Sequence, residues 1–245
     1  MWVMSHWSNI AEDPNDVAAI AFRKDTVVAA WRGLVPSRTG YIASLCAGKR
    51  VLDIGVVDHT LGRGMTMHRA VAESAAYCLC IDILPAAIEE MRRQGFNVRL
   101  CDITRDSLDE KFDLVIAGEV IEHLGNSAGL IEAAARLLLP GGRLILTTPN
   151  PYYLARIRDG LRGDVRESVD HVGLHWPSGI AELCERAGLR LDQYRGQLSE
   201  NTRTLKAKLA FGSRRLLCFA GVSEQCFGHT FIYECTLATD RNASS

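Results

Sequence analysis

The sequence lacks an excess of charge of either sign. Its 28 lysine and arginine residues nearly cancel its 29 aspartate and glutamate residues, so the formal net charge over 245 residues is -1. A chain of this kind produces no long-range field that would gather nucleic acid or an anionic membrane. The balance therefore predicts a small-molecule partner and no bound nucleic acid.

Long hydrophobic runs are also missing. No uninterrupted apolar run approaches the ~20 residues of a membrane span, and residues 1–16 contain no basic cluster followed by an apolar stretch. We therefore expect a soluble, cytoplasmic protein with no membrane span. The hydrophobic share of 47% suffices for the core of one domain. The sequence is also compatible with a homodimer.

The eight cysteines lack the Cys-x-x-Cys spacing of a zinc or redox site. Several lie inside apolar runs, and free cysteine behaves as a small buried hydrophobe. We therefore expect reduced core cysteines rather than a disulfide framework.

From residue 50 onward, short apolar segments alternate with segments of helical character. Such alternation implies crossover units and a parallel sheet with helices on both faces, and strands covered on both faces are apolar throughout. The expected strands are 51–54, 77–82, 97–101, 112–117 and 143–148, and the expected helices are 65–76, 85–94 and 127–139.

The two ends of the chain are less regular. Residues 1–48 predict a helical cap or lid segment, with a helix over 17–31 that Gly33 and Pro36 end. The main domain is expected over 49–240, with insertions at about 150–176 and 198–228. Between the insertions a helix over 177–187 and a strand over 189–194 are expected, and a last strand over 230–237 follows.

Ligands of an open parallel sheet bind beyond the carboxyl ends of its strands. The residues at those ends are therefore the candidates for binding: Asp53 and Gly55 after the first strand, Asp82 after the second, Asp102 after the third, and Gly118 with Glu119 after the fourth.

This ordered set resembles the class I S-adenosylmethionine-dependent methyltransferases. The resemblance covers residues 49 to about 149 and rests on six stretches: Val51–Gly55, Cys80–Ile83, Leu100–Ile103, Phe112–Ile116, Glu119–Leu124 and Leu139–Gly142. It implies an α/β fold with a Rossmann-like, seven-stranded, mostly parallel sheet whose last strand is antiparallel. It also implies S-adenosylmethionine as cofactor.

The resemblance assigns the strand-end residues to parts of the cofactor. Asp82 is placed to accept the ribose hydroxyls, as in dinucleotide folds, and Asp102 to accept the exocyclic amine of adenine. Ile83 and Ile103 would hold the ring between them. Gly55 allows the backbone to approach the ligand, and Asp53 orders its loop and the ligand's amino group. For any one of these carboxylates alone, a helix cap or a solvated strand end is the simpler reading.

One departure from the family pattern lies in the loop after the first strand. The loop continues as Val56-Val57-Asp58-His59-Thr60, with Val57 where a second glycine is expected, and Gly62 and Gly64 come later. Two interpretations follow: a repositioned but working cofactor loop, which the persistence of Asp53, Asp82 and Asp102 favours, or a site that no longer binds.

Histidines are the candidates for the acceptor side, because an oxygen nucleophile benefits from a nearby base and histidine suits that role at neutral pH. His123 follows the fourth strand, and His171 lies beside Asp170 in the polar segment after the fifth. His59 and His68 are less favoured alternatives. The spacing of these four histidines identifies no metal site, so no bound metal is expected.

We expect O-methylation of a small hydroxylated acceptor, a sugar or glycan precursor first, because the loop resembles that of glycan-pathway methyltransferases. The alternatives are a quinone precursor as acceptor, or an inactive methyltransferase fold that acts as a binding module. A nicotinamide-dependent oxidoreductase would need Gly-x-Gly-x-x-Gly after the first strand, and this sequence lacks it there.

Overall fold

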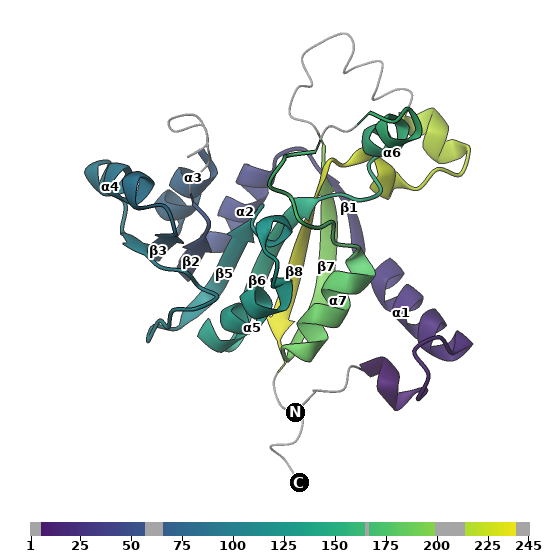
Figure 1. The fold of residues 1–245 in the computed structure, drawn as a ribbon, viewed down its shortest axis with the longest axis horizontal. Helices are drawn as coiled ribbons and strands as arrows, with labels where there is room; N and C mark the ends of the chain where they lie inside the picture. Colours follow the sequence, from purple (N-terminus) through teal and green to yellow (C-terminus); the bar gives the residue numbers. More distant parts are fainter. Residues whose placement is uncertain (1–5, 57–65, 165–166, 199–213, 239–245) are drawn as a thin grey trace.

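A computed structural model describes residues 6–56, 66–164, 167–198 and 214–238. Its strands form one eight-stranded sheet in the order β1-β7-β8-β6-β5-β2-β3-β4 (Figure 1). Only β8 runs antiparallel to its neighbours, β6 and β7. The expected α/β class and the antiparallel last strand are confirmed, whereas the expected strand count of seven is too low by one.

The strands and helices have the following bounds. The strands are β1 Trp31–Val35, β2 Arg50–Ile54, β3 Tyr77–Asp82, β4 Val98–Leu100, β5 Phe112–Gly118, β6 Leu138–Pro149, β7 Leu189–Gln197 and β8 Thr230–Leu237. The α-helices are α1 Val17–Ala30, α2 Arg38–Cys46, α3 Thr66–Ser74, α4 Pro85–Arg93, α5 Ser127–Leu137, α6 Leu154–Leu161 and α7 Pro177–Arg186. Short 3-10 helices are η1 His6–Asn9, η2 Ile121–His123 and η3 Glu224–Phe227.

The additional strand is β1, which sequence reasoning missed. Helix α1 ends at Ala30, and the chain passes directly into β1, which pairs in parallel with β7 at one edge of the sheet. Gly33 has a φ of 82° inside this strand, a left-handed conformation that only glycine adopts readily. Gly33 is therefore part of a strand, not a helix end. The division of the chain at residue 48 stays a prediction.

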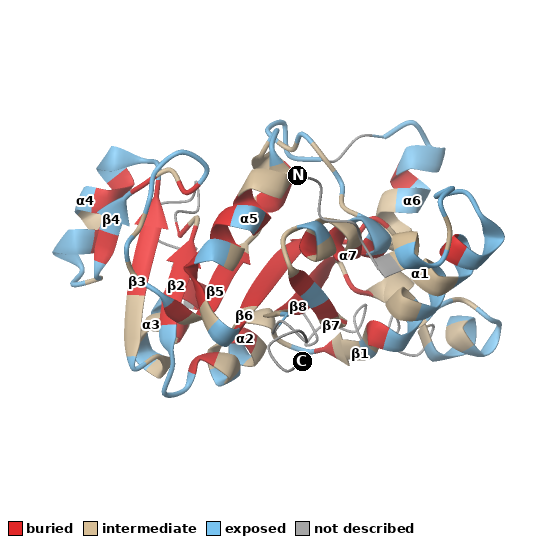
Figure 2. Ribbon diagram, turned by 90° about the horizontal axis from the view of Figure 1, so that it is seen from below, coloured by how far each residue is buried: buried red, intermediate tan, exposed pale blue. Residues whose placement is uncertain are grey.

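Apolar layers cover both faces of the sheet, because alternate strand residues point to opposite sides. On one face Leu52 and Ile81 pack with buried residues of α5 and α7. On the other face Val51 packs with α2 and α3, and Cys80 packs with α4. Figure 2 shows the strands buried almost throughout, with exposed residues on the outer sides of the helices. The sheet is thus the middle of three layers.

All eight cysteines are free thiols in this structure, and five of them are buried. Their reduced state stays a prediction. In the described ranges, no helix is both long and apolar enough to cross a membrane.

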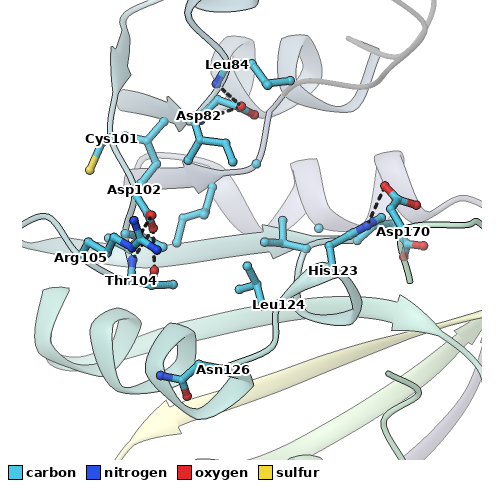
Figure 3. A pocket seen from close by; sticks show the side chains of 18 of the residues that line it. Asp82, Leu84, Cys101, Asp102, Thr104, Arg105, His123, Leu124, Asn126 and Asp170 are labelled. Carbon is cyan, nitrogen blue, oxygen red and sulfur yellow. Dashed lines mark hydrogen bonds and ion pairs between the residues drawn. The ribbon is translucent and has the colours of Figure 1, made fainter. Parts of the chain in front are cut away.

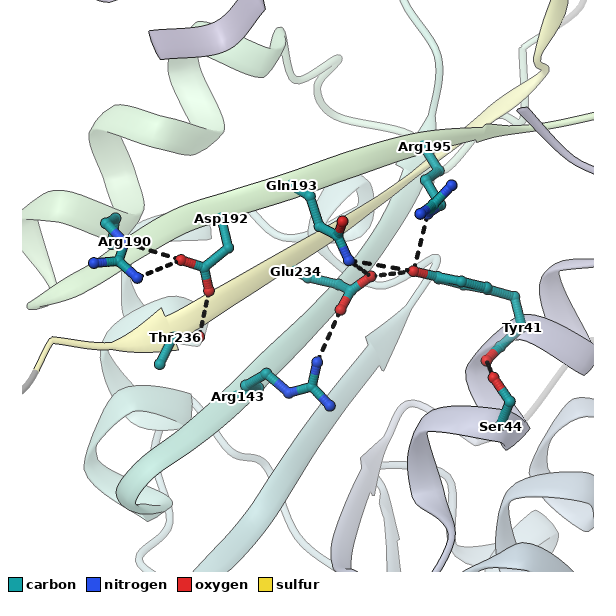
Figure 4. Close-up of polar contacts among 9 residues, drawn as sticks. All are labelled: Tyr41, Ser44, Arg143, Arg190, Asp192, Gln193, Arg195, Glu234 and Thr236. Atoms are coloured by element: carbon teal, nitrogen blue, oxygen red, sulfur yellow. Dashed lines mark hydrogen bonds and ion pairs between the residues drawn. The ribbon is translucent and has the colours of Figure 1, made fainter. Parts of the chain in front are cut away.

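A buried polar network ties β8 to its neighbours and to α2 (Figure 4). The Glu234 side chain on β8 is 3% exposed and accepts from Arg143 on β6 at 3.0 Å and from Gln193 on β7 at 2.7 Å. The hydroxyl of Tyr41 on α2 also donates to it, and Arg195 donates to that hydroxyl at 3.0 Å. Both carboxylate oxygens of Glu234 are therefore satisfied within the protein.

Candidate active site

A cavity of about 680 Å³ opens at the carboxyl ends of β2, β3, β4 and β5. This is the edge where an open parallel sheet binds ligands, and the volume falls in the range of small-molecule sites. Seven of the eight residues expected to bind cofactor line it: Gly55, Asp82, Ile83, Asp102, Ile103, Gly118 and Glu119. In Figure 3, Asp82 and Asp102 lie on one side and His123 with Asp170 on the other.

Asp82, the last residue of β3, is held in place by the loop that follows it. Its Oδ1 accepts the backbone N–H groups of Ile83 at 2.7 Å and Leu84 at 3.0 Å. Pro85 then begins α4, as the sequence predicts. These bonds fix the carboxylate at the cavity, although Asp82 is only 7% exposed.

Asp102 is fixed in a similar way just after β4. Its Oδ1 accepts from the backbone N–H of Thr104 at 3.0 Å and from the Thr104 hydroxyl at 2.6 Å. The Thr104 bonds lower the pKa of Asp102, so the carboxylate is charged at neutral pH. Ile103 beside it is buried, and Ile83 is 64% exposed, so an apolar surface next to each carboxylate is available to a ring.

Two glycines allow the backbone to pass close to its neighbours here. Gly55 has a φ of 72°, and a Cβ on it would overlap Cγ2 of Val120. At Gly118 a Cβ would lie 2.8 Å from Cε of Met67. Neither position accommodates a side chain without displacing a neighbour.

Asp53 is the one expected cofactor residue that does not line the cavity. It is fully buried on β2, and its Oδ2 lies 2.7 Å from Nδ1 of His68 on α3, which does line the cavity. Burial lowers the pKa of His68, but the Asp53 carboxylate more than offsets this, and the net shift is upward. Asp53 therefore contacts a residue of the cavity wall, His68, without lining the cavity itself. Sequence analysis named His68 as a less favoured candidate.

Glu119 stands at the end of β5 in a strained backbone conformation. Its φ of 57° is left-handed, which costs a non-glycine residue about 1 kcal/mol or more. Its Oε1 lies 2.9 Å from Arg38 and accepts from the Thr147 hydroxyl at 3.0 Å. Arg38 lines the cavity from α2, and sequence reasoning missed it because its segment was read as a cap.

The two expected catalytic histidines come together. The rings of His123 and His171 are 4.7 Å apart edge to face, although 48 residues separate them in the chain. The backbone carbonyl of Glu122 draws the two segments together by accepting from Val172 at 2.8 Å and Gly173 at 3.3 Å. His123 lines the cavity.

Asp170, which directly precedes His171 in the chain, contacts the other histidine. Its Oδ2 lies 3.1 Å from Nδ1 of His123 (Figure 3). The carboxylate closest to Nδ1 of His171 in the described ion pairs is that of Glu167, at 3.8 Å. Asp170 also lines the cavity, so this end of the cavity contains a carboxylate–imidazole pair.

Glu122 directly precedes His123 in the chain. It is fully buried, and the groups that hydrogen-bond near its carboxylate are the Thr148 side chain and its own backbone N–H. Burial and the nearby charge of Glu119 raise the pKa of Glu122 to about 8. Glu122 was not an expected site residue, because a glutamate beside His123 has no sequence pattern that reveals its burial.

The loop residues Val57 to Thr60, Gly62 and Gly64 lie outside the described residues, and so do Lys206 and Lys208 of the second insertion. Val56 before the loop is fully buried. Whether the glycine-poor loop binds cofactor stays a prediction.

Comparison with known proteins places this site in a family. The family described as "Methyltransferase domain" matches residues 31–194, which include every strand of the sheet from β1 to β6 and most of β7. The chain therefore belongs to the class I S-adenosylmethionine-dependent methyltransferases, as the resemblance of its motifs implies.

Individual relatives include two ubiquinone biosynthesis O-methyltransferases. That of Xylella fastidiosa strain M23 is 29% identical over 68% of this chain and 72% of its own length. That of Aromatoleum aromaticum is 30% identical over 61% of this chain and 68% of its own length.

Solved structures share the fold at lower identity. Magnesium protoporphyrin IX methyltransferase from Synechocystis, with bound S-adenosylhomocysteine, is 16% identical, with a TM-score of 0.56 over 95% of this chain and 93% of its own. The N-methyltransferase NodS from Bradyrhizobium japonicum, in complex with the same product, is also 16% identical. Its TM-score is 0.51 over 83% of this chain and 86% of its own.

Proposed function

We propose that this methyltransferase binds S-adenosylmethionine against Asp82, Ile83, Asp102 and Ile103 and transfers the methyl group to a hydroxyl oxygen of a small acceptor. The observation that carries the proposal is that one cavity holds both halves of such a site. One end offers two oriented carboxylates with apolar side chains beside them, and the other offers an imidazole with a carboxylate at 3.1 Å.

The two ends have different chemical tasks. Carboxylates that accept from ribose and adenine orient the cofactor, and holding a methyl donor in line with a nucleophile supplies much of the rate of a displacement. His123, with Asp170 beside it, and His171 promote the loss of the acceptor's hydroxyl proton. Gly118 and Glu119, at the end of β5, also line the cavity, and the ion pair with Arg38 holds the Glu119 side chain there.

A hydroxylated ring of the quinone-precursor type is the acceptor that the relatives support. The names of those relatives include O-methylation in ubiquinone biosynthesis. The sugar or glycan acceptor expected from the sequence depends on the loop at Val56–Thr60, and residues 57–60 lie outside the described part of the chain. No contact in the cavity favours the sugar.

Calorimetric titration with S-adenosylhomocysteine tests the cofactor half. We expect micromolar binding, and Asp82→Ala should weaken it about tenfold or more, because a hydrogen bond to a charged group contributes about 1.5–3 kcal/mol. Asp109→Ala is the matched control, since Asp109 is exposed and does not line the cavity. Absence of binding at millimolar ligand would refute the proposed function and favour a binding module of another kind.

A further inference from the structure

Two cysteine side chains lie together on one face of β3. Cys78 and Cys80 are two residues apart in the strand, so their side chains point to the same side of the sheet. Their Sγ atoms are 3.9 Å apart. Leu79 between them points to the opposite side and belongs to the main apolar layer. The two cysteines therefore form a dithiol on the face of the sheet that packs against α4.

The distance between the two sulfur atoms fits the chelation of a metal ion. A zinc–thiolate bond is about 2.3 Å long, and two such bonds at the tetrahedral angle place their sulfur atoms about 3.8 Å apart. The sulfur atoms of Cys78 and Cys80, at 3.9 Å, already have this spacing. The pair therefore needs no change in its spacing to hold an ion.

An ion can reach the pair from the solvent. Both cysteines line a cavity of about 320 Å³ between α3 and the turn that follows α4. Cys78 is half-buried, and Cys80 is buried. No residue of this cavity lines the candidate active site. The dithiol is therefore separate from that site, and an inference about it does not rest on the proposed function.

A positive side chain in the cavity wall offsets the charge of thiolate ligands. Arg69 of α3 lines the cavity, and its guanidinium carbon lies 5.4 Å from the centre of the Phe96 ring, which lines it as well. The thiolate is the form of cysteine that binds metals, and a nearby arginine favours it. Hydrogen bonding with Cys78 and burial raise the pKa of Cys80, so Cys80 keeps its proton until an ion displaces it.

A second close pair of cysteines shows what is specific to the first. Sγ of Cys184 on α7 and Sγ of Cys235 on β8 are 3.3 Å apart, and both residues are 0% exposed within the main apolar layer. Neither lines the cavity beside β3. Cys184 and Cys235 therefore act as packed core residues, whereas Cys78 and Cys80 combine the spacing of two ligands with an open cavity.

We propose that Cys78 and Cys80 bind one soft, thiophilic metal cation, of the kind represented by zinc and monovalent copper, as a two-thiolate chelate. Thiolates select such ions over the hard cations magnesium and calcium. Both thiol protons pass to the solvent as the two metal–sulfur bonds form, and the open cavity leaves room for further ligands. The site was not expected from the sequence, because Cys-x-Cys is not the Cys-x-x-Cys spacing of a zinc site.

Titration of the full chain with Cd²⁺, after reduction of the thiols and removal of bound metal with a chelator, tests the proposal. Cd²⁺ is the probe because its bonds to thiolates give an ultraviolet charge-transfer band. We expect one Cd²⁺ per chain with that band, a micromolar or lower dissociation constant, and release of two protons per ion into weakly buffered solution. Cys78→Ser and Cys80→Ala should each weaken binding tenfold or more, because each removes one of the two thiolate ligands.

Two other cysteines supply the controls. Cys218→Ser is the matched variant, because Cys218 is also a half-buried free thiol but lies outside this cavity. Cys184→Ala removes one thiol of the buried pair. Both variants should bind Cd²⁺ as the wild type does.

Three results would overturn the proposal: no thiolate band at millimolar Cd²⁺, equal binding by the wild type, Cys78→Ser and Cys80→Ala, or loss of the band in Cys218→Ser. Circular dichroism of each variant checks the fold, and Cys78→Ser keeps the test valid if Cys80→Ala unfolds. Failure to bind Cd²⁺ refutes this site alone, and failure to bind S-adenosylhomocysteine refutes the proposed function alone.

Discussion

Two equally buried glutamates show how the halves of the sheet differ. Glu234 on β8 is 2% exposed, and Arg143, Gln193 and Tyr41 satisfy its oxygens (Figure 4). Glu122, after β5, is 0% exposed, and its carboxylate has the Thr148 side chain and its own backbone N–H nearby but no ion pair among the described residues. The first carboxylate is therefore held by charged and polar partners, whereas burial raises the pKa of the second to about 8.

The same contrast holds for the ends of the strands. Toward the end of β7, beside the start of β8, the protein fills the space with its own aromatic side chains, and the rings of Tyr194, Phe231 and Tyr233 lie within 6 Å of one another. Where β3 and β5 end, it leaves a cavity lined by Asp82 and Glu119. Packed aromatic rings fill the first region, whereas the second is open to a small molecule.

The largest effect on stability should come from replacing Glu234, whose two carboxylate oxygens are both hydrogen-bonded. Glu234→Gln removes charge-assisted bonds in a buried network, and we expect the free energy of unfolding to fall by about 3 kcal/mol. Glu122→Gln should change it by less than about 1 kcal/mol at pH 7, because a pKa of about 8 leaves the Glu122 carboxyl largely neutral and the amide replaces a neutral group. Urea unfolding of the two variants measures both changes. Equal losses would remove the distinction between the two glutamates.

A smaller, pH-dependent effect is expected at His68, which faces Asp53, Arg38 and Asp82. Because the folded-state pKa of His68 is raised, its charged pair with Asp53 contributes fully below about pH 6.5, the unfolded value. The contribution is lost as the pH rises through the folded-state pKa. His68→Asn should therefore cost about 2 kcal/mol near pH 6 and clearly less near pH 9.

Urea unfolding of the wild type and His68→Asn at a series of pH values checks this sign. A difference that grows with pH would mean that His68 is neutral in the fold and that Asp53 is held in another way.

The smallest effect should come from Asp102, which is half-exposed and already satisfied by Thr104. Asp102→Asn keeps an acceptor oxygen, so S-adenosylhomocysteine binding should weaken only about fivefold, near 1 kcal/mol. Calorimetry under the conditions used for Asp82→Ala measures it. A loss larger than that of Asp82→Ala would reverse the roles assigned to the two carboxylates.

Local patterns predicted the parts of the fold that depend on neighbours in sequence. Strand β3 and the start of α4 at Pro85 were placed to the residue, because an apolar run and a proline at a helix start are local signals. Strand β1 was missed, since its pairing with β7 joins residues about 160 apart. An edge strand that follows a helix without a turn carries no comparable signal.

The candidate site shows the same division between features set by local sequence and features set by long-range packing. The sequence by itself determined that carboxylates and glycines stand at the strand ends, because the order of apolar strands and polar ends is written along the chain. Only the tertiary structure decided that Asp53 lies beneath the cavity, that Arg38 joins Glu119, and that Glu122, His123 and His171 meet. Distant residues become neighbours through packing and crossover connections, and a single sequence contains no direct record of those contacts.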